Sequence, residues 1–141
     1  MEILFDIGGT KTRIARLDDD GDMGKPIVYD TPKMYRDGIA LLVSSIREIS
    51  AGQKIEAMAG GIAGPWDRSQ NNLISSPNLP DWVGKPLQET LEKEFQVKIY
   101  VENDAAMVGL GEATAGAGKG YGIVVYFTVS TGVGGARIVN G

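Results

Sequence analysis

The chain has 141 residues, which is enough for one domain of ordinary size and too few for two. Hydrophobic residues make up 43% and charged residues 23% of the chain, and no apolar run approaches the ~20 residues of a membrane span, so no membrane partner is expected. A net charge of -4 argues against electrostatic binding of nucleic acid over a broad surface, so no nucleic-acid partner is expected. Cysteine is absent and the start resembles no secretory signal, which fits the cytoplasm. Histidine is also absent, so a general base within this chain must be a carboxylate or, less readily, a lysine.

Short apolar runs separated by turns predict an antiparallel three-stranded meander at the start of the chain. Its strands are expected at residues 2–7, 12–17 and 26–29, and residues 8–11 are expected to form the first turn. Apolar residues at helical spacing then predict a helix over 36–50 that covers one face of the sheet. A buried strand is expected over 55–62, followed by a loop rich in Asn, Ser and Pro over 66–82.

The second half of the chain predicts a helix after Pro86, a strand over 97–101 and a further helix over 105–115 that Asn103 or Asp104 can cap. Gly109 and Gly111 are expected to permit close packing of that helix. The end of the chain repeats the strand, glycine turn and strand with which the chain begins. The repeat consists of a very hydrophobic strand over 122–129, a glycine turn over 130–135 and an apolar run over 136–139. Because an isolated hairpin is only marginally stable, we expect one domain over 1–118 and, over 119–141, the opening hairpin of a truncated second domain.

The first candidate site is the run Asp6-Ile7-Gly8-Gly9-Thr10-Lys11. Adjacent glycines can turn their amides outward to bind an anion, and Thr10 and Lys11 can reach phosphate oxygens. Asp6, at the end of a strand, can orient the cation of a nucleotide. An isolated Gly-Gly pair is more often a plain type I′ hairpin beside a solvated lysine, and the spacing of a Walker loop is missing.

Three further motifs have chemical and structural interpretations. At the strand-to-helix junction, Asp104 can take a proton from a hydroxyl while Asn103 positions the alcohol, or the pair is a simple helix cap. The loop over 75–82, which contains Asn78, suits sugar hydroxyls or is a turn-rich connection. The turn over 130–135 is a second phosphate nest or an ordinary hairpin, and no metal cluster stands out.

The order of these motifs resembles the ROK family (repressor, open reading frame, kinase) of sugar kinases. Five motifs follow one another across essentially the whole chain: Asp-x-Gly-Gly-Thr-Lys, Gly-x-x-Gly-Pro, Ser-Pro-Asn-Leu-Pro-x-Trp, Glu-Asn-Asp-Ala and Thr-Gly-Val-Gly-Gly. The resemblance implies an α/β fold of the actin-like, ribonuclease-H-like ATPase class, with a mixed sheet flanked by helices. It also implies an ATP-dependent hexose kinase of the glucokinase type, which transfers the γ-phosphate of ATP to the 6-hydroxyl of a sugar.

Residue by residue, the resemblance implies a role for each motif. The first phosphate loop would be Gly8, Gly9, Thr10 and Lys11, with Asp6 near Mg²⁺, and the second would be Thr131, Gly132 and Gly134. Gly64, Asn78, Asn103 and Asp104 would hold the sugar, and Asp104 would be the general base. The family's zinc cluster would lie in the second domain, beyond this chain, so the chain alone is expected to turn over slowly or not at all.

Two other functions remain open. A sugar-sensing domain of a ROK-type transcriptional repressor would carry a helix-turn-helix module ahead of the first phosphate loop, which here begins shortly after Met1. A non-enzymatic actin-like assembly protein would not need the Asn-Leu-Pro-x-Trp loop. The sequence leaves open which hexose is used and whether polyphosphate also serves as donor. The apolar strand over 123–129 invites self-pairing, so we expect a homodimer.

Overall fold

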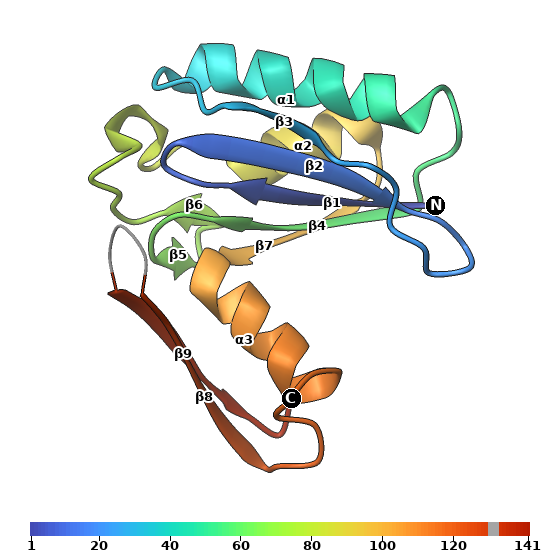
Figure 1. Ribbon diagram of the computed structural model, residues 1–141. Coiled ribbons are helices and arrows are strands. Elements are labelled where there is room, and N and C mark those ends of the chain that lie inside the picture. Colours follow the sequence, from blue (N-terminus) through green and yellow to red (C-terminus); the bar gives the residue numbers. More distant parts are fainter. Residues whose placement is uncertain (130–132) are drawn as a thin grey trace.

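The computed structural model describes residues 1–129 and 133–141 and shows an α/β architecture around a five-stranded mixed sheet (Figure 1). The strand order is β3-β2-β1-β4-β7. The antiparallel part consists of β1 (Glu2–Ile7), β2 (Lys11–Leu17) and β3 (Ile27–Asp30). The strands β4 (Ala57–Ile62) and β7 (Lys98–Asn103) run parallel to β1. The predicted mixed sheet and its opening meander are therefore confirmed.

Helices lie on both sides of this sheet (Figure 1). The helices α1 (Tyr35–Ser50) and α2 (Leu87–Phe95) lie on one face, and α3 (Asp104–Thr114) lies on the other. Side chains alternate between the faces along β1, so Ile3, Phe5 and Ile7 are buried in the core while the residues between them face the α3 side. The core joins these strand residues to Leu42 and Ile46 of α1 and Leu87 and Leu91 of α2.

The segment expected to be an irregular loop contains regular structure. A two-residue ladder joins β5 (Trp66–Asp67) to β6 (Asn72–Leu73), and a 3₁₀ helix, η1, spans Pro80–Trp82. Leu73, Leu79 and Trp82 are fully or nearly fully buried here. Strands of two residues are too short to show an alternation of apolar and polar residues, so the sequence pattern could not predict them.

A hairpin of β8 (Ile123–Val129) and β9 (Val133–Val139) packs on the side of α3 away from the sheet (Figure 1). A Cβ on Gly109 would lie 3.1 Å from the Cβ of Tyr126, so this glycine lets the hairpin approach the helix as predicted. The same expectation for Gly111 was wrong, because a Cβ there would meet nothing within 4 Å. The domain division at residue 118 stays a prediction. None of the helices in the described ranges is long and apolar enough to cross a membrane.

Trp82 fixes the start of α1 against η1. Its indole Nε1 donates to the Pro32 carbonyl at 3.0 Å, and its ring meets Tyr35 edge-on at 5.4 Å between centroids. A Cβ on Gly38 would lie 2.1 Å from Cζ2 of the same ring. This position of α1 therefore requires glycine.

We predict that Gly38→Ala lowers the free energy of unfolding by about 1–3 kcal/mol, because the added methyl overpacks against a buried ring. Gly111→Ala is the matched control, since its methyl meets nothing and alanine favours the helix by about 0.5–1 kcal/mol. Chemical denaturation of both variants measures the difference. Equal stability of the two variants would contradict the packing argument.

Candidate active site

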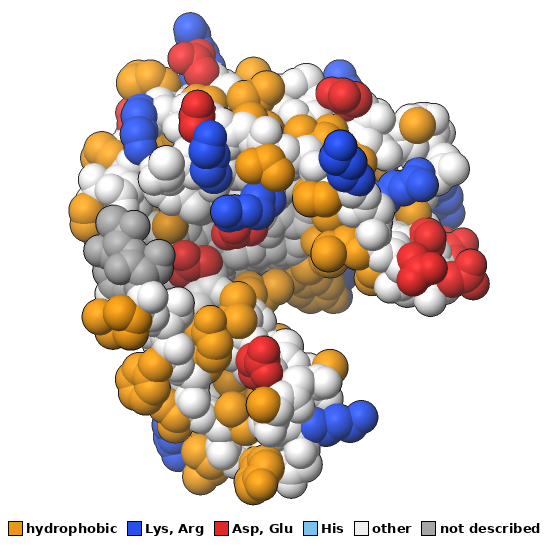
Figure 2. Space-filling view, viewed as in Figure 1, with side chains coloured by type: hydrophobic (Ala, Val, Ile, Leu, Met, Phe, Trp, Pro, Cys, Tyr) orange, Lys and Arg blue, Asp and Glu red, His pale blue; other side chains and the backbone are white. Residues whose placement is uncertain are grey.

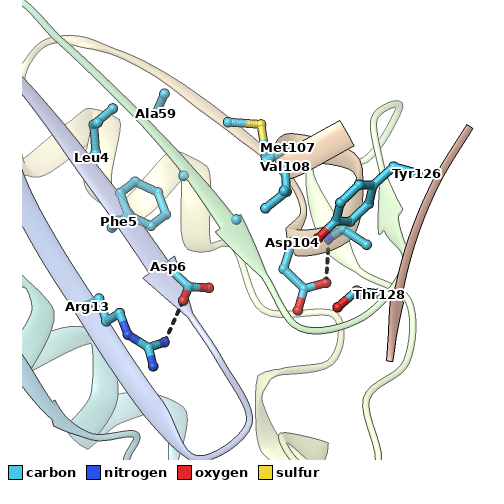
Figure 3. A pocket seen from close by; sticks show the side chains of 13 residues that line it. Leu4, Phe5, Asp6, Arg13, Ala59, Asp104, Met107, Val108, Tyr126 and Thr128 are labelled. Carbon is cyan, nitrogen blue, oxygen red and sulfur yellow. Dashed lines mark hydrogen bonds and ion pairs between the residues drawn. The ribbon is translucent and has the colours of Figure 1, made fainter. Parts of the chain in front are cut away.

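A cleft of about 550 Å³ lies between the five-stranded sheet, α3 and β8. Figure 2 shows it as a deep hollow between the part of the molecule that carries the sheet and the part formed by α3 and the hairpin. Asp6 and Asp104 both line it, although they are far apart in the chain. In Figure 3 the two carboxylates lie on either side of the end of β4, with Thr128 of β8 beyond Asp104. The cleft therefore brings together the two acidic residues that the sequence singled out.

Asp104 is the first residue of α3, and its carboxylate is held by one oxygen. Oδ1 accepts hydrogen bonds from the Ala105 amide at 2.8 Å and from Asn103 Nδ2 at 3.0 Å. Oδ2 accepts none from the residues that the structure describes. One oxygen of the carboxylate is thus anchored, and the other is available to accept a proton from a ligand hydroxyl.

Asn103 caps α3, and its side chain is also tied to the loop after β4. Its Oδ1 accepts from the Ala106 amide at 3.0 Å, which confirms the cap, and its Nδ2 donates to the Gly64 carbonyl at 2.9 Å. With the bond to Asp104, both amide hydrogens are engaged. Gly64 has a φ of +140°, and a Cβ there would lie 2.3 Å from the Ser75 carbonyl oxygen. Asn103 and Gly64 therefore form one rigid junction beside the cleft.

Asp6 is the penultimate residue of β1 and forms an ion pair with Arg13. Arg13 Nη1 lies 2.9 Å from Asp6 Oδ2, and the two residues face each other across the β1–β2 ladder (Figure 3). Arg13 also lines the cleft. Arg13 was not predicted as a site residue, although a hairpin with its turn at 8–11 places residues 6 and 13 opposite each other. The charge of Asp6 is balanced within the cleft wall.

The glycines of the first turn are required because other atoms pack closely against them, and not because their backbone is left-handed. Neither Gly8 nor Gly9 has a positive φ, so the type I′ alternative was wrong. A Cβ on Gly8 would lie 2.8 Å from the Lys11 carbonyl oxygen, and one on Gly9 would lie 2.5 Å from the Cβ of Asn78. The candidate sugar residue Asn78 is therefore packed directly on the candidate phosphate turn.

The side chains around this turn are engaged within the protein. Lys11 begins β2 and forms an ion pair with Asp30 at 2.7 Å, so it is neither free nor simply solvated. The backbone carbonyl of Thr10 accepts from the Thr31 amide at 2.9 Å. Lys33, which the sequence analysis did not single out, donates to the Gly9 carbonyl at 2.6 Å. None of Gly8, Gly9, Thr10, Lys11 and Asn78 lines the cleft between Asp6 and Asp104.

The expected second phosphate loop is described only at its end. Thr131 and Gly132 lie outside the described residues. Gly134 was expected in the turn but belongs to β9, where it pairs with Thr128. A Cβ on Gly134 would lie 3.4 Å from the Cβ of Ala105, so this part of β9 runs beside the start of α3. No group of three or more His, Cys, Asp and Glu side chains comes together for a metal within residues 1–129 and 133–141.

Comparison with known proteins gives a consistent assignment. The ROK family model matches residues 3–141. A glucokinase from Thermotoga maritima is 35% identical over 99% of this chain and 44% of its own length. An N-acetyl-D-glucosamine kinase from Pectobacterium atrosepticum is 30% identical over 97% of this chain and 45% of its own length. The chain thus spans about half the length of the curated relatives it matches.

A solved structure agrees with these relatives. The structure of a ROK family glucokinase from Streptomyces griseus, in complex with glucose and AMPPNP, superposes with a TM-score of 0.85 and 32% identity. The superposition covers 99% of this chain and 44% of the glucokinase chain. The actin-like α/β fold expected from the sequence is therefore confirmed. With its motifs, its mixed sheet and a family match over nearly its whole length, this chain belongs to the ROK family.

Proposed function

We propose that this chain is part of an ATP-dependent, glucokinase-like hexose kinase, which transfers the γ-phosphate of ATP to the 6-hydroxyl of a sugar in the cytoplasm. The observation that carries the proposal is the shared cleft of Asp6 and Asp104, in a ROK chain that superposes on a glucokinase bound to glucose and AMPPNP. The two carboxylates suit different tasks, because one lies beside the phosphate turn and the other begins the helix next to the candidate sugar junction.

In this proposal Asp104 is the general base. Its free Oδ2 takes the proton from the sugar 6-hydroxyl, and the hydroxyl oxygen then attacks the γ-phosphorus of ATP. The bond from that phosphorus to the β,γ-bridging oxygen breaks, and ADP leaves. The bonds from Ala105 and Asn103 hold the other carboxylate oxygen, so the base is positioned before the sugar arrives. Phosphoryl transfer depends mostly on such positioning and on charge neutralisation.

The phosphates would be held by the two glycine turns. Gly8, Gly9, Thr10 and Lys11 would be the first phosphate loop. Gly134 of β9, beside the start of α3, would belong to the second, together with Thr131 and Gly132, which lie outside the described residues. Mg²⁺ is commonly bound by one or two carboxylates together with substrate phosphates and water, and Asp6 offers one half-exposed carboxylate, so the residues present fit an indirect metal site. Bound there, Mg²⁺ would neutralise charge on the phosphates.

The sugar would be held by Gly64, Asn78, Asn103 and Asp104. Asn103 has no amide hydrogen left for a ligand in this conformation, so we infer that it binds sugar only through its oxygen and acts mainly by fixing Asp104. Relatives named as glucokinase and as N-acetyl-D-glucosamine kinase both match over nearly the whole chain, which supports a hexose or an N-acetylated hexosamine as the acceptor.

We expect Asp104→Asn in the full-length protein to lower kcat by at least about 100-fold while sugar binding survives, because a general base contributes roughly 10²–10⁴-fold. A coupled ADP-release assay with Mg-ATP and a hexose panel measures turnover, and calorimetry measures binding. Asp20→Asn, in an exposed loop, is the matched control and should retain full activity. Sugar binding without turnover by the unmodified protein would indicate a sensor instead.

A phosphate that binds Lys11 would compete with Asp30 for its ammonium group. The Lys11 ammonium, through its hydrogen bond and its charge, lowers the pKa of the Asp30 carboxyl below the ordinary value. That pairing stabilises the fold above the unfolded pKa of about 3.9, and the stabilisation is lost as pH falls through the folded pKa. The pKa of Asp30 therefore reports where the Lys11 side chain lies.

We predict that Mg-ATP raises the pKa of Asp30 toward its ordinary value and that Lys11→Met does the same without nucleotide. An NMR titration of the Asp30 carboxyl measures both. Lys25→Met, which removes an exposed charge before β3, is the control and should leave this pKa low. A low pKa that persists with bound nucleotide would mean that Lys11 does not contact the phosphates.

We also propose that the 141-residue chain self-associates through the outer face of its hairpin. This hairpin outer face consists mainly of exposed apolar residues, and the exposed Gly135 and Arg137 of β9 lie among them. The apolar residues are Ile123, Val125, Phe127, Val129, Val133 and Val139. Figure 2 shows hydrophobic side chains gathered over this part of the molecule. Both strands of the two-stranded sheet also have an unpaired edge. An apolar face with open edges favours pairing with a second copy.

Sedimentation of the 141-residue chain should show a mass that rises with concentration. Phe127→Lys, near the centre of β8, should shift the chain to monomer, because a lysine on the hairpin outer face opposes the burial of that face. Tyr121→Lys is a matched control, since Tyr121 and Phe127 are both 72% exposed but Tyr121 lies outside β8. A chain that remains monomeric at all concentrations would exclude a homodimer of this kind.

A further inference from the structure

The segment between β3 and α1, residues 31–35, contacts the candidate phosphate turn. Thr31 Oγ1 donates to the Gly8 carbonyl at 2.8 Å, and the Thr31 amide donates to the Thr10 carbonyl at 2.9 Å. Lys33 Nζ donates to the Gly9 carbonyl at 2.6 Å. Three successive carbonyls of the turn are therefore held from one side by this short segment.

The same segment also contacts the loop that carries Asn78. Lys33 Nζ donates to the Asn78 carbonyl at 3.2 Å, and Trp82 Nε1 donates to the Pro32 carbonyl at 3.0 Å. The Tyr35 amide donates to Asp81 Oδ2 at 2.8 Å. The segment over 31–35 is thus bound on one side to the phosphate turn and on the other to the candidate acceptor loop.

Lys33 is the one residue of this segment whose side chain bonds to both loops among the described residues. Its ammonium is a charged donor, and charge-assisted hydrogen bonds are roughly twice as strong as neutral ones. An exposed lysine loses up to ~2 kcal/mol of side-chain entropy when its position is fixed, so its two bonds to backbone carbonyls must offset that loss. Asn78 packs so closely on Gly9 that a Cβ on Gly9 would have no room. The two loops therefore touch where Lys33 donates to their carbonyls.

We propose that Lys33 is a positioning residue for phosphate transfer, which keeps the phosphate turn in register with the acceptor loop through the Gly9 and Asn78 carbonyls. The inference rests on the proposed kinase function, in which one loop holds the donor and the other the acceptor. Lys33 acts through these backbones and touches no reacting atom. A misplacement of about 1 Å between reacting groups can lower a rate ~100-fold, so a modest shift of one loop is enough to matter.

The test compares Lys33→Met, Lys33→Arg and Lys25→Met in the full-length protein, with Mg-ATP and a hexose that the unmodified enzyme phosphorylates. We expect Lys33→Met to lower kcat about tenfold or more, with both KM values changed less than threefold. Lys33→Arg keeps a charged fork that can donate to two carbonyls, so it should restore kcat to within about threefold. Lys25→Met removes the same charge elsewhere and should leave kcat unchanged.

Hydrogen exchange measured by mass spectrometry gives a readout independent of turnover. In Lys33→Met, exchange should rise together in peptides that contain residues 8–12 and 75–80, and it should stay at the unmodified level in Lys33→Arg. A kcat within twofold of the unmodified enzyme in Lys33→Met would overturn the proposal. So would a higher KM for ATP alone, which would make Lys33 a nucleotide contact. Absence of turnover by the unmodified protein would instead refute the proposed kinase function.

Discussion

The site depends on how closely α3 approaches the sheet at Gly61. A Cβ at this position of β4 would lie 2.9 Å from the Cα of Asp104, so any other residue would push the start of the helix away. Asp104, which lines the cleft with Asp6, would shift with the start of the helix. The hairpin would move as well, because it packs on α3 at Gly109. A single position without a side chain thus sets the separation between the two walls of the cleft.

Much of the fold could be predicted because it depends on local patterns. Alternation along β1 and helical spacing along α1 place their apolar residues in the core. The candidate acids could also be found, because Asp6 and Asp104 lie where a strand ends, and neighbouring parallel strands end at one edge of a sheet. The family resemblance rests on the same residues and is confirmed by the match over residues 3–141.

Most of the features that could not be predicted depend on residues that become neighbours only in the folded chain. Lys11 looked free because its partner, Asp30, becomes a neighbour only when β3 pairs with β2. Lys33 gave no signal, because its two acceptors are backbone carbonyls, which every residue possesses. Gly134 was assigned to a turn because glycine is common there, whereas the ladder with β8 makes it part of a strand.

The ion pair between Asp6 and Arg13 has a consequence for how charged ligands enter. Arg13 is an internal counter-ion, so an anionic nucleotide approaching this wall of the cleft meets a neutral pair instead of a bare carboxylate. A cation that bound Asp6 through Oδ2 would displace the guanidinium, which would then be free to pair with an anion. After this exchange Asp6 would bind the metal and Arg13 would be available to a phosphate. The net charge of this wall of the cleft would rise by the charge of the incoming ion alone.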